Sequence, residues 1–466
     1  MKRREFLRNS ICTALGGAGL YSALGNLRLV EAATRAYGAS SFDDYKALVC
    51  VFMFGGNDSL NMVIPRDNDH YQQYRTARAT LAVEQSQLLP LVPQTGGGAS
   101  DGADYGLQSS IIGDDTVGMS GLQGLFNNGQ AAVLGNVGTL IRPTSKADYA
   151  NHAVELPPQL FSHNDQQQYW QVSRTGDGRN LGWGGRIADL LHDANPDAFI
   201  PMSVSLNFES ILQRAATGSQ YVIGNDGPRY FSRFEWDGDS RRAFLALMAP
   251  NAQPHVFGRS YANSFRRARE NADAVGTALD SSSPLQTVFP ANNDLAAQLQ
   301  MVARMIKVRE VLGLKRQVYF VSMGGFDNHD RLLSEQPALL SRLSQAMTAF
   351  HAATVELGVA DKVTAFTASD FGRTLSSNGD GSDHGWGGHH FVVGGAVRGG
   401  RFFGQMPTLV NGGNDDAGWG QIIPTTPVDL YAATLAKWFG VADTDLDLIF
   451  PNLGNFSPRR DLGFMG

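Results

Sequence analysis

The chain has 466 residues, of which 42% are hydrophobic and 10% aromatic, a composition typical of globular proteins. Its formal net charge is -6, which argues against a nucleic-acid-binding protein, because such proteins present a basic surface to phosphates. A chain of this length can bury a large core, so folding requires neither disulfides nor a structural metal.

The first 33 residues predict an export signal. Arg3 and Arg4 are followed by Phe6 and Leu7, then by a weakly apolar run rich in glycine and alanine and by small residues. This pattern resembles a twin-arginine signal, so we expect a periplasmic or secreted protein that meets the twin-arginine translocon during export. The alternative, a short membrane helix, is disfavoured because the run is too short and too rich in glycine. No later segment approaches about 18 uninterrupted apolar residues, so we expect no membrane span in the mature chain.

Apolar runs rich in β-branched and aromatic residues predict the strands of a sheet. Those strands are expected within 47–54, 131–138, 199–207, 317–330 and 362–374. The first run contains Cys50, the one cysteine after the predicted signal, which indicates a buried thiol and excludes an intrachain disulfide. Because several of these runs lead directly into glycine and polar residues, they are typical of parallel strands that enter loops.

Helices are predicted between the strands, at 293–313, 335–358 and 426–440, from helical spacing of apolar residues and from the glycine that ends each segment. Alternating strands and helices predict an α/β fold with a mostly parallel sheet. We expect one domain over residues 45–466. Insertions near 94–120 and 207–290 are expected to cover the sheet or to shape a pocket.

Polar, metal-capable residues follow three of the predicted strands, and ligands of such sheets bind beyond the carboxyl ends of the strands. These residues are Asn57, Asp58, Ser59, Asn61, Asp327, His329, Asp330, Asp370, Arg373, Asp383, His384, His389 and His390. Carboxylates together with imidazoles suit zinc, manganese or iron. The sequence therefore predicts a shared polar site that binds one or two divalent ions. Arg373 would bind a phosphate or sulfate through its planar guanidinium group.

Each of these residues also has a structural interpretation. Asp58 could cap a following helix, and Arg373 could form an ion pair with Asp370. Asp383 and His384 lie in a glycine-rich segment that is typical of a turn.

Ser162 and His163 follow two prolines and precede a polar, helix-like run. Ser162 is placed like a helix N-cap, and the N-terminus of a helix is a favourable site for an anion. Either Ser162 is an ordinary cap, or it serves as a nucleophile or substrate ligand with His163 beside it.

Several motifs together resemble a bacterial family, domain of unknown function 1501. They are the twin-arginine lead, VFMFGGNDSLNMVIP, GGFDNHD, SDFGRTLSSNGDGSDHGWGGHHFVVGGAVRGGRFFGQMP and IIPTTPVDLYAATLAKWFGV. That family is similar to the alkaline phosphatase and sulfatase superfamily. The resemblance implies a three-layer α/β sandwich with a central, mostly parallel sheet and with metals bound at the strand ends.

The resemblance also implies roles for particular residues. Asp58 matches the metal-binding aspartate after the first strand, and Asp327 with His329 matches a later ligand pair. Asp370 matches the aspartate of an Asp-His pair, but Phe371 stands in place of the histidine.

The ligands missing from that pair would come from Asp383 and His384, with His389 or His390 as a last histidine. Ser162 and Ser59 are the candidate nucleophiles, although neither lies in a motif of the superfamily.

Two functions follow as hypotheses. The first is an exported, metal-dependent hydrolase of small anionic phosphate or sulfate esters that uses zinc or manganese. The second is a non-catalytic exported binding or assembly protein on the same fold, with an unknown protein partner. The absence of a histidine at Phe371 and of a nucleophile motif favours the second.

Overall fold

The computed structural model describes residues 42–112, 115–174, 180–230 and 238–466. The predicted export signal, at residues 1–33, lies outside them. Within the described residues, no helix combines the length and the apolar character needed to cross a membrane.

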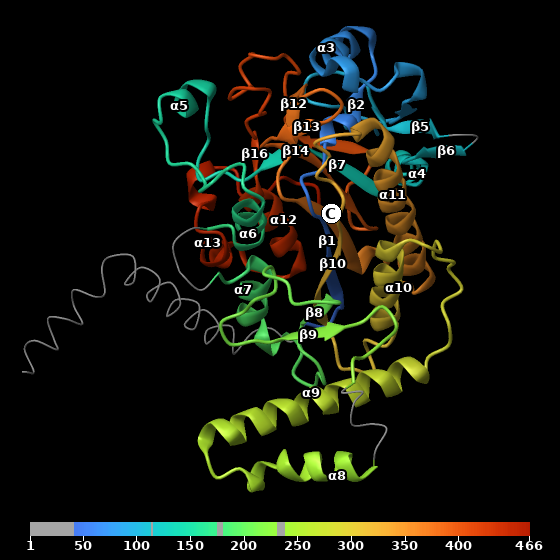
Figure 1. Ribbon diagram of the computed structural model, residues 1–466, viewed down its shortest axis with the longest axis vertical. Helices are drawn as coiled ribbons and strands as arrows, with labels where there is room; N and C mark the ends of the chain where they lie inside the picture. The colour runs from blue at the N-terminus through green and yellow to red at the C-terminus, as the bar shows by residue number, and fades with distance from the viewer. Residues whose placement is uncertain (1–41, 113–114, 175–179, 231–237) are drawn as a thin grey trace, which may run out of the picture.

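A central sheet of nine strands organises the described part of the chain (Figure 1). Its spatial order is β15 (Arg401–Gly404), β7 (Ala131–Gly138), β14 (Gly388–Val393), β11 (Val363–Ser369), β1 (Lys46–Met53), β10 (Arg316–Met323), β8 (Ser203–Leu206) and β9 (Gln220–Ile223), and β16 (Thr426–Pro427) pairs with β7. Only β14 runs against the others in this sheet, since it pairs antiparallel with both β11 and β7. The predicted mostly parallel sheet is confirmed.

Helices cover both faces of the sheet, which makes three layers (Figure 1). One face packs against α4 (Ser120–Asn127), α10 (Asp294–Lys307) and α11 (Leu332–Glu356), and the other against α6 (His163–Val172), α7 (Trp183–Leu190), α12 (Val428–Phe439) and α13 (Leu446–Ile449). Two separate apolar cores result, one on each side of the sheet. The three-layer α/β fold expected from the sequence is confirmed.

The strands form where the apolar runs predict them. β1 is buried along nearly its whole length, as a central strand with helices on both faces must be. Its alternate residues enter the two cores: Val49 and Val51 contact one, Cys50 and Phe52 the other. The buried position of Cys50 is as expected, and burial raises the pKa of its thiol.

The remaining strands and helices lie around the ends of the sheet. They are β2 (Val63–Pro65), β3 (Leu89–Pro90), β4 (Tyr105–Leu107), β5 (Ser109–Ile112), β6 (Asp115–Gly118), β12 (Arg373–Ser377), β13 (Ser382–His384), α3 (Asn68–Arg78), α5 (Lys146–Ala150), α8 (Gly238–Leu247) and α9 (Val256–Asp280). β12 and β13 form an antiparallel hairpin just beyond the carboxyl end of β11. The long helices α8 and α9, from the predicted insertion at 207–290, lie at the opposite end of the molecule from that hairpin (Figure 1).

Candidate metal centre

Three neighbouring strands deliver their loops to one place. β10 leads to Asp327, β1 to Gly55 and β11 to Asp370, and β1 lies between the other two strands in the sheet. The loops lie very close together: the Gly55 N–H donates to Asp370 Oδ2 at 3.2 Å. Gly55 has a φ of +115°, and a Cβ there would lie 2.5 Å from the backbone nitrogen of Asp327. The close approach of these two loops therefore requires glycine at position 55.

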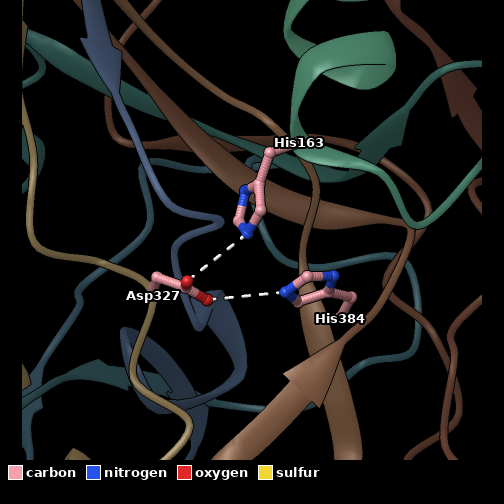
Figure 2. Close-up of side chains that lie close together, drawn as sticks. All are labelled: His163, Asp327 and His384. Atoms are coloured by element: carbon pink, nitrogen blue, oxygen red, sulfur yellow. Dashed lines mark ion pairs between the residues drawn. The ribbon is translucent and has the colours of Figure 1, made fainter.

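Asp327 lies at the centre of the site, with three imidazole rings around it. His163 begins α6, and His384 ends β13; Figure 2 shows both side chains directed at the Asp327 carboxylate. The separations are 3.4 Å from His163 Nε2 to Asp327 Oδ2 and 3.5 Å from His384 Nε2 to Asp327 Oδ1. His329 Nε2 lies 3.1 Å from Asp327 Oδ1. All three histidines therefore present the same ring nitrogen to one carboxylate.

The ring of His163 is oriented by Asp370. Its Nδ1 lies 2.6 Å from Asp370 Oδ2, which also accepts hydrogen bonds from Gln167 Nε2 at 2.8 Å and from Gly55. Because Oδ2 has these other donors, it acts as an acceptor, and His163 Nδ1 carries the proton. In the neutral ring Nε2 then has a free lone pair, and this buried atom has no hydrogen-bond partner.

His384 and His329 are oriented in the same way. His384 Nδ1 donates to the Phe161 carbonyl oxygen at 2.7 Å, since a carbonyl can only accept. His329 Nδ1 lies 3.0 Å from Asp383 Oδ1, and Asn378 Nδ2 donates to that same oxygen at 2.9 Å. With Nδ1 as the donor, the neutral form of each ring has its lone pair on Nε2.

Burial and neighbouring charges shift the pKa values of Asp327, Asp370 and His384 in different directions. Burial disfavours the charged form of Asp327, but the hydrogen bond from Arg373 and the positive charge of that guanidinium lower the pKa of Asp327 below its usual value. Asp370 is buried, and burial raises its pKa despite its donors. Burial also lowers the pKa of His384, which favours its neutral, ligand-competent form.

Arg373 lies behind Asp327. Its side chain is fully buried, Nη1 donates to Asp327 Oδ1 at 2.8 Å, and Nη2 donates to the Ser382 carbonyl at 2.6 Å. Both terminal nitrogens of the Arg373 guanidinium therefore donate to groups of the protein. The guanidinium fixes the orientation of the Asp327 carboxylate.

Three of the predicted ligands lie outside this cluster. Asp58 is buried in an ion pair with Arg78, whose Nη2 lies 2.5 Å from Asp58 Oδ2, and it accepts from Ser382 Oγ at 2.9 Å. His389 and His390 are buried within β14. Burial lowers their pKa values to about 4 and about 3.

Ser162 occupies the N-cap position of α6, as expected from the sequence, yet its side chain makes no capping hydrogen bond. Its hydroxyl donates instead to Asp165 Oδ2 at 2.6 Å. The segment containing Ser162 also contributes the Phe161 carbonyl and His163, so Ser162 lies next to the cluster. Ser59, the other candidate nucleophile, is buried and accepts the His389 N–H at 2.8 Å.

Some residues of the site carry no signal in the sequence. Gln167, one helical turn after His163, shares Asp370 with it, and Asn378 shares Asp383 with His329. Phe371 packs against two of the imidazoles, with ring centroids 4.9 Å from His163 and 4.7 Å from His384. The position where a histidine was expected thus supports the rings rather than adding one.

The donor set fits a divalent metal ion. His163, Asp327 and His384 each offer a ligand atom, and these atoms lie within 4.8 Å of one another. The unpartnered buried lone pair of His163 and acceptors behind each Nδ1 are the arrangement that surrounds histidine ligands in metal sites. Imidazole nitrogens with one carboxylate suit zinc or manganese. Among the described residues, His163, Asp327 and His384 are the group whose ligand atoms lie this close together.

The sequence also matches, over residues 45–436, a family described as "Protein of unknown function (DUF1501)". The chain belongs to the DUF1501 family. The family resemblance noted in the sequence is thereby confirmed. No curated protein matches this DUF1501 chain.

Several solved structures are similar to this DUF1501 protein at low identity. Ps i-CgsB, solved in complex with k-i-k-neocarrahexaose, has 9% identity and a TM-score of 0.34, covering 87% of this chain and 74% of its own. The PsFucS1 sulfatase from Pseudoalteromonas sp. has 12% identity and a TM-score of 0.32, covering 90% and 72%. The lipoteichoic acid synthase LtaP from Listeria monocytogenes has 10% identity and a TM-score of 0.33, covering 90% and 81%.

Proposed function

We propose that this protein is an exported, metal-dependent hydrolase of phosphate or sulfate esters. One observation carries the proposal: three histidine Nε2 atoms converge on Asp327 while an acceptor holds each Nδ1. The resemblance of the sequence motifs to the alkaline phosphatase and sulfatase superfamily supports the same chemistry. The predicted twin-arginine signal supports export.

The ligands of the ion would be His163, His329, His384 and Asp327. Asp370 and Asp383 would orient two of the rings, and Arg373 would orient the carboxylate. When bound, zinc or manganese supplies a Lewis acid that polarises an ester oxygen.

The first turn of α6 supports an anionic substrate. The helix has ten residues, and its N-terminal N–H groups donate no hydrogen bond to the Ser162 side chain. Helix N-terminal N–H groups bind anionic oxygens, and here they lie beside the metal ligand His163.

Ser162 would act as the nucleophile. Its hydroxyl already donates to Asp165 at 2.6 Å, so Asp165 is placed to take the proton as Oγ attacks phosphorus or sulfur. The bond from phosphorus or sulfur to the ester oxygen would then break, and Asp165 would return the proton to the leaving alcohol. Attack by water on the phosphorylated or sulfated Ser162 would release phosphate or sulfate and restore the serine.

The experiment combines metal analysis with hydrolysis of 4-nitrophenyl phosphate and 4-nitrophenyl sulfate, using protein purified without chelator. We expect one ion per chain and hydrolysis of one of the two esters. Ser162→Ala should keep the ion and lose activity, whereas His163→Ala should lose both. His152→Ala, an exposed histidine elsewhere, is the matched control. A folded wild-type protein that contains no metal and hydrolyses neither ester would contradict the proposal.

A second function, metal-dependent binding without catalysis, is favoured by one observation. Arg373, the predicted anion-gripping residue, is buried and occupied by Asp327 and Ser382. In the same experiment this function predicts one ion per chain and no hydrolysis of either ester.

A further inference from the structure

Helices α8 and α9 form a hairpin that projects from the body of the protein (Figure 1). Its connection spans residues 248–255. The C-terminal half of α9 reaches the core on one face of the sheet, where Val275, Ala278 and Leu279 are buried. The half of α9 nearest the connection and all of α8 are largely exposed. The hairpin therefore has a packed base and a free tip.

Large apolar side chains gather at this tip. Leu247 is 60% exposed, Val256 59%, Phe257 77% and Tyr261 64%. These four lie within fifteen residues of one another, whereas the other exposed large apolar side chains among the described residues are scattered over the chain. Single exposed apolar residues are ordinary, but a cluster of this kind marks an interaction surface.

The hairpin also carries a run of arginines without acidic residues among them. Residues 241–269 contain no aspartate or glutamate, although the whole chain has a net charge of -6. The arginines in this stretch are Arg241, Arg242, Arg259, Arg266, Arg267 and Arg269. Three of them pair with acidic residues that flank the stretch, in ion pairs that are exposed to solvent. Over the whole hairpin, residues 238–280, the six arginines exceed the four acidic residues Asp239, Glu270, Asp273 and Asp280, so its formal charge is 6 - 4 = +2.

We propose that the tip of the α8–α9 hairpin docks the protein on an anionic lipid surface. Protruding aromatic and aliphatic side chains can enter the boundary between headgroups and acyl chains, and the arginines can pair with lipid phosphates. An acidic protein groove would satisfy the arginines too, but a projecting tip with apolar side chains on its outside fits a soft lipid interface better.

The docked orientation has a consequence for the metal centre. The hairpin and the β12–β13 hairpin lie at opposite ends of the molecule (Figure 1). His384 ends β13, so docking through α8–α9 turns the metal centre away from the lipid. The site would remain open to ligands in the surrounding solution. This inference does not depend on the proposed hydrolysis.

The test is cosedimentation of the full-length mature protein with vesicles. Vesicles of phosphatidylglycerol and phosphatidylcholine are compared with vesicles of phosphatidylcholine alone. We expect binding to the first and far weaker binding to the second, and loss of binding in about 1 M NaCl, where the Debye length falls to about 3 Å.

The variants separate the two contributions. Arg259→Gln should weaken binding about fivefold, because one arginine near an anionic surface contributes about 1 kcal/mol. Phe257→Ser should weaken it by about tenfold or more, because the lipid would no longer bury an aromatic side chain at this position. The matched controls are Val288→Ser, at a position 86% exposed and outside the hairpin, and Arg459→Gln, which is also exposed; both should bind like the wild type.

Three outcomes would overturn the proposal. They are absence of binding to anionic vesicles, equal binding to both kinds of vesicle, and equal effects of the tip variants and their controls. If Phe257→Ser instead dissociates a dimer in gel filtration while vesicles leave the protein in solution, the tip joins two copies of the chain. His163→Ala should bind vesicles normally, which keeps this test separate from that of the metal centre.

Discussion

His329 Nε2 lies 2.9 Å from His384 Nε2. Each ring has its other nitrogen beside an acceptor, Asp383 Oδ1 for His329 and the Phe161 carbonyl for His384. In two neutral rings so oriented, the facing nitrogens both carry lone pairs, which repel at this distance. A proton or a metal ion between them would remove the repulsion, so the pair is arranged to accept a cation.

Added zinc should therefore stabilise the folded protein. A ligand that binds only the native state at about 100 times its dissociation constant contributes about 2.7 kcal/mol to the free energy of unfolding. We expect the melting temperature of chelator-treated protein to rise when zinc is added, as followed by differential scanning calorimetry. His384→Ala should show little of this rise, while His152→Ala should show all of it. An unchanged melting temperature in the wild type would exclude a site of useful affinity.

Asp370→Asn tests the orientation of His163. Asparagine can still accept the His163 Nδ1–H, but it lacks the negative charge that strengthens this hydrogen bond and the basicity of Nε2. Loss of such a partner typically lowers metal affinity by about 10- to 100-fold. Competition with a chromogenic chelator measures the affinity. Asp380→Asn, at an exposed aspartate in the nearby turn, should bind zinc as the wild type does. Equal affinities for the two variants would remove Asp370 from the centre.

The sheet was predictable from the sequence because its strands are buried on both faces. The apolar run at 47–54 became β1, and the runs that contain β10 and β11 lie on either side of it. Strand ends that meet in this way also made Asp327 and Asp370 predictable as neighbours. The local sequence is enough to predict both the strands and the proximity of these two aspartates.

The assembly of the centre was less predictable because it depends on long-range packing. Asp58 follows β1 as expected, but Arg78 from the end of α3 neutralises it, and nothing in the sequence near Asp58 indicates that pairing. His389 and His390 lie only five and six residues beyond His384, yet they belong to β14 and are buried in the sheet. His163 reaches Asp327 from a helix distant in sequence, and its position beside Ser162 predicted a catalytic role without indicating its proximity to Asp327.

Gly56→Ala should disturb the centre through Phe371. Gly56 has a φ of +79°, and a Cβ there would lie 2.4 Å from the Phe371 ring, which packs against His163 and His384. We expect a loss of about 1–3 kcal/mol in the free energy of unfolding, measured by urea denaturation, together with weaker zinc binding.

The matched control for Gly56→Ala is Gly412→Ala. Its φ is similar at +73°, but nothing lies within 4 Å of the added Cβ. It should therefore show the backbone strain without the effect on zinc. Weakened zinc binding in both variants would mean that strain alone, and not the ring contact, disturbs the ligands.

His390 should contribute to the acid sensitivity of the fold, independently of metal. It is buried against Trp170, with ring centroids 4.8 Å apart, and burial together with the nearby His389 lowers its pKa to about 3. Between pH 3 and the ordinary value of 6.5, the unfolded chain binds a proton here that the folded chain does not. The stability from this residue is thus present above pH 6.5 and is lost as the pH falls towards 3, by up to about 1.4 kcal/mol per pH unit.

Urea denaturation of chelator-treated protein between pH 7 and pH 4 measures the slope of the free energy of unfolding against pH. His390→Gln should have a shallower slope than the wild type, and His152→Gln should match the wild type. Parallel slopes for His390→Gln and the wild type would show that His390 does not titrate with unfolding.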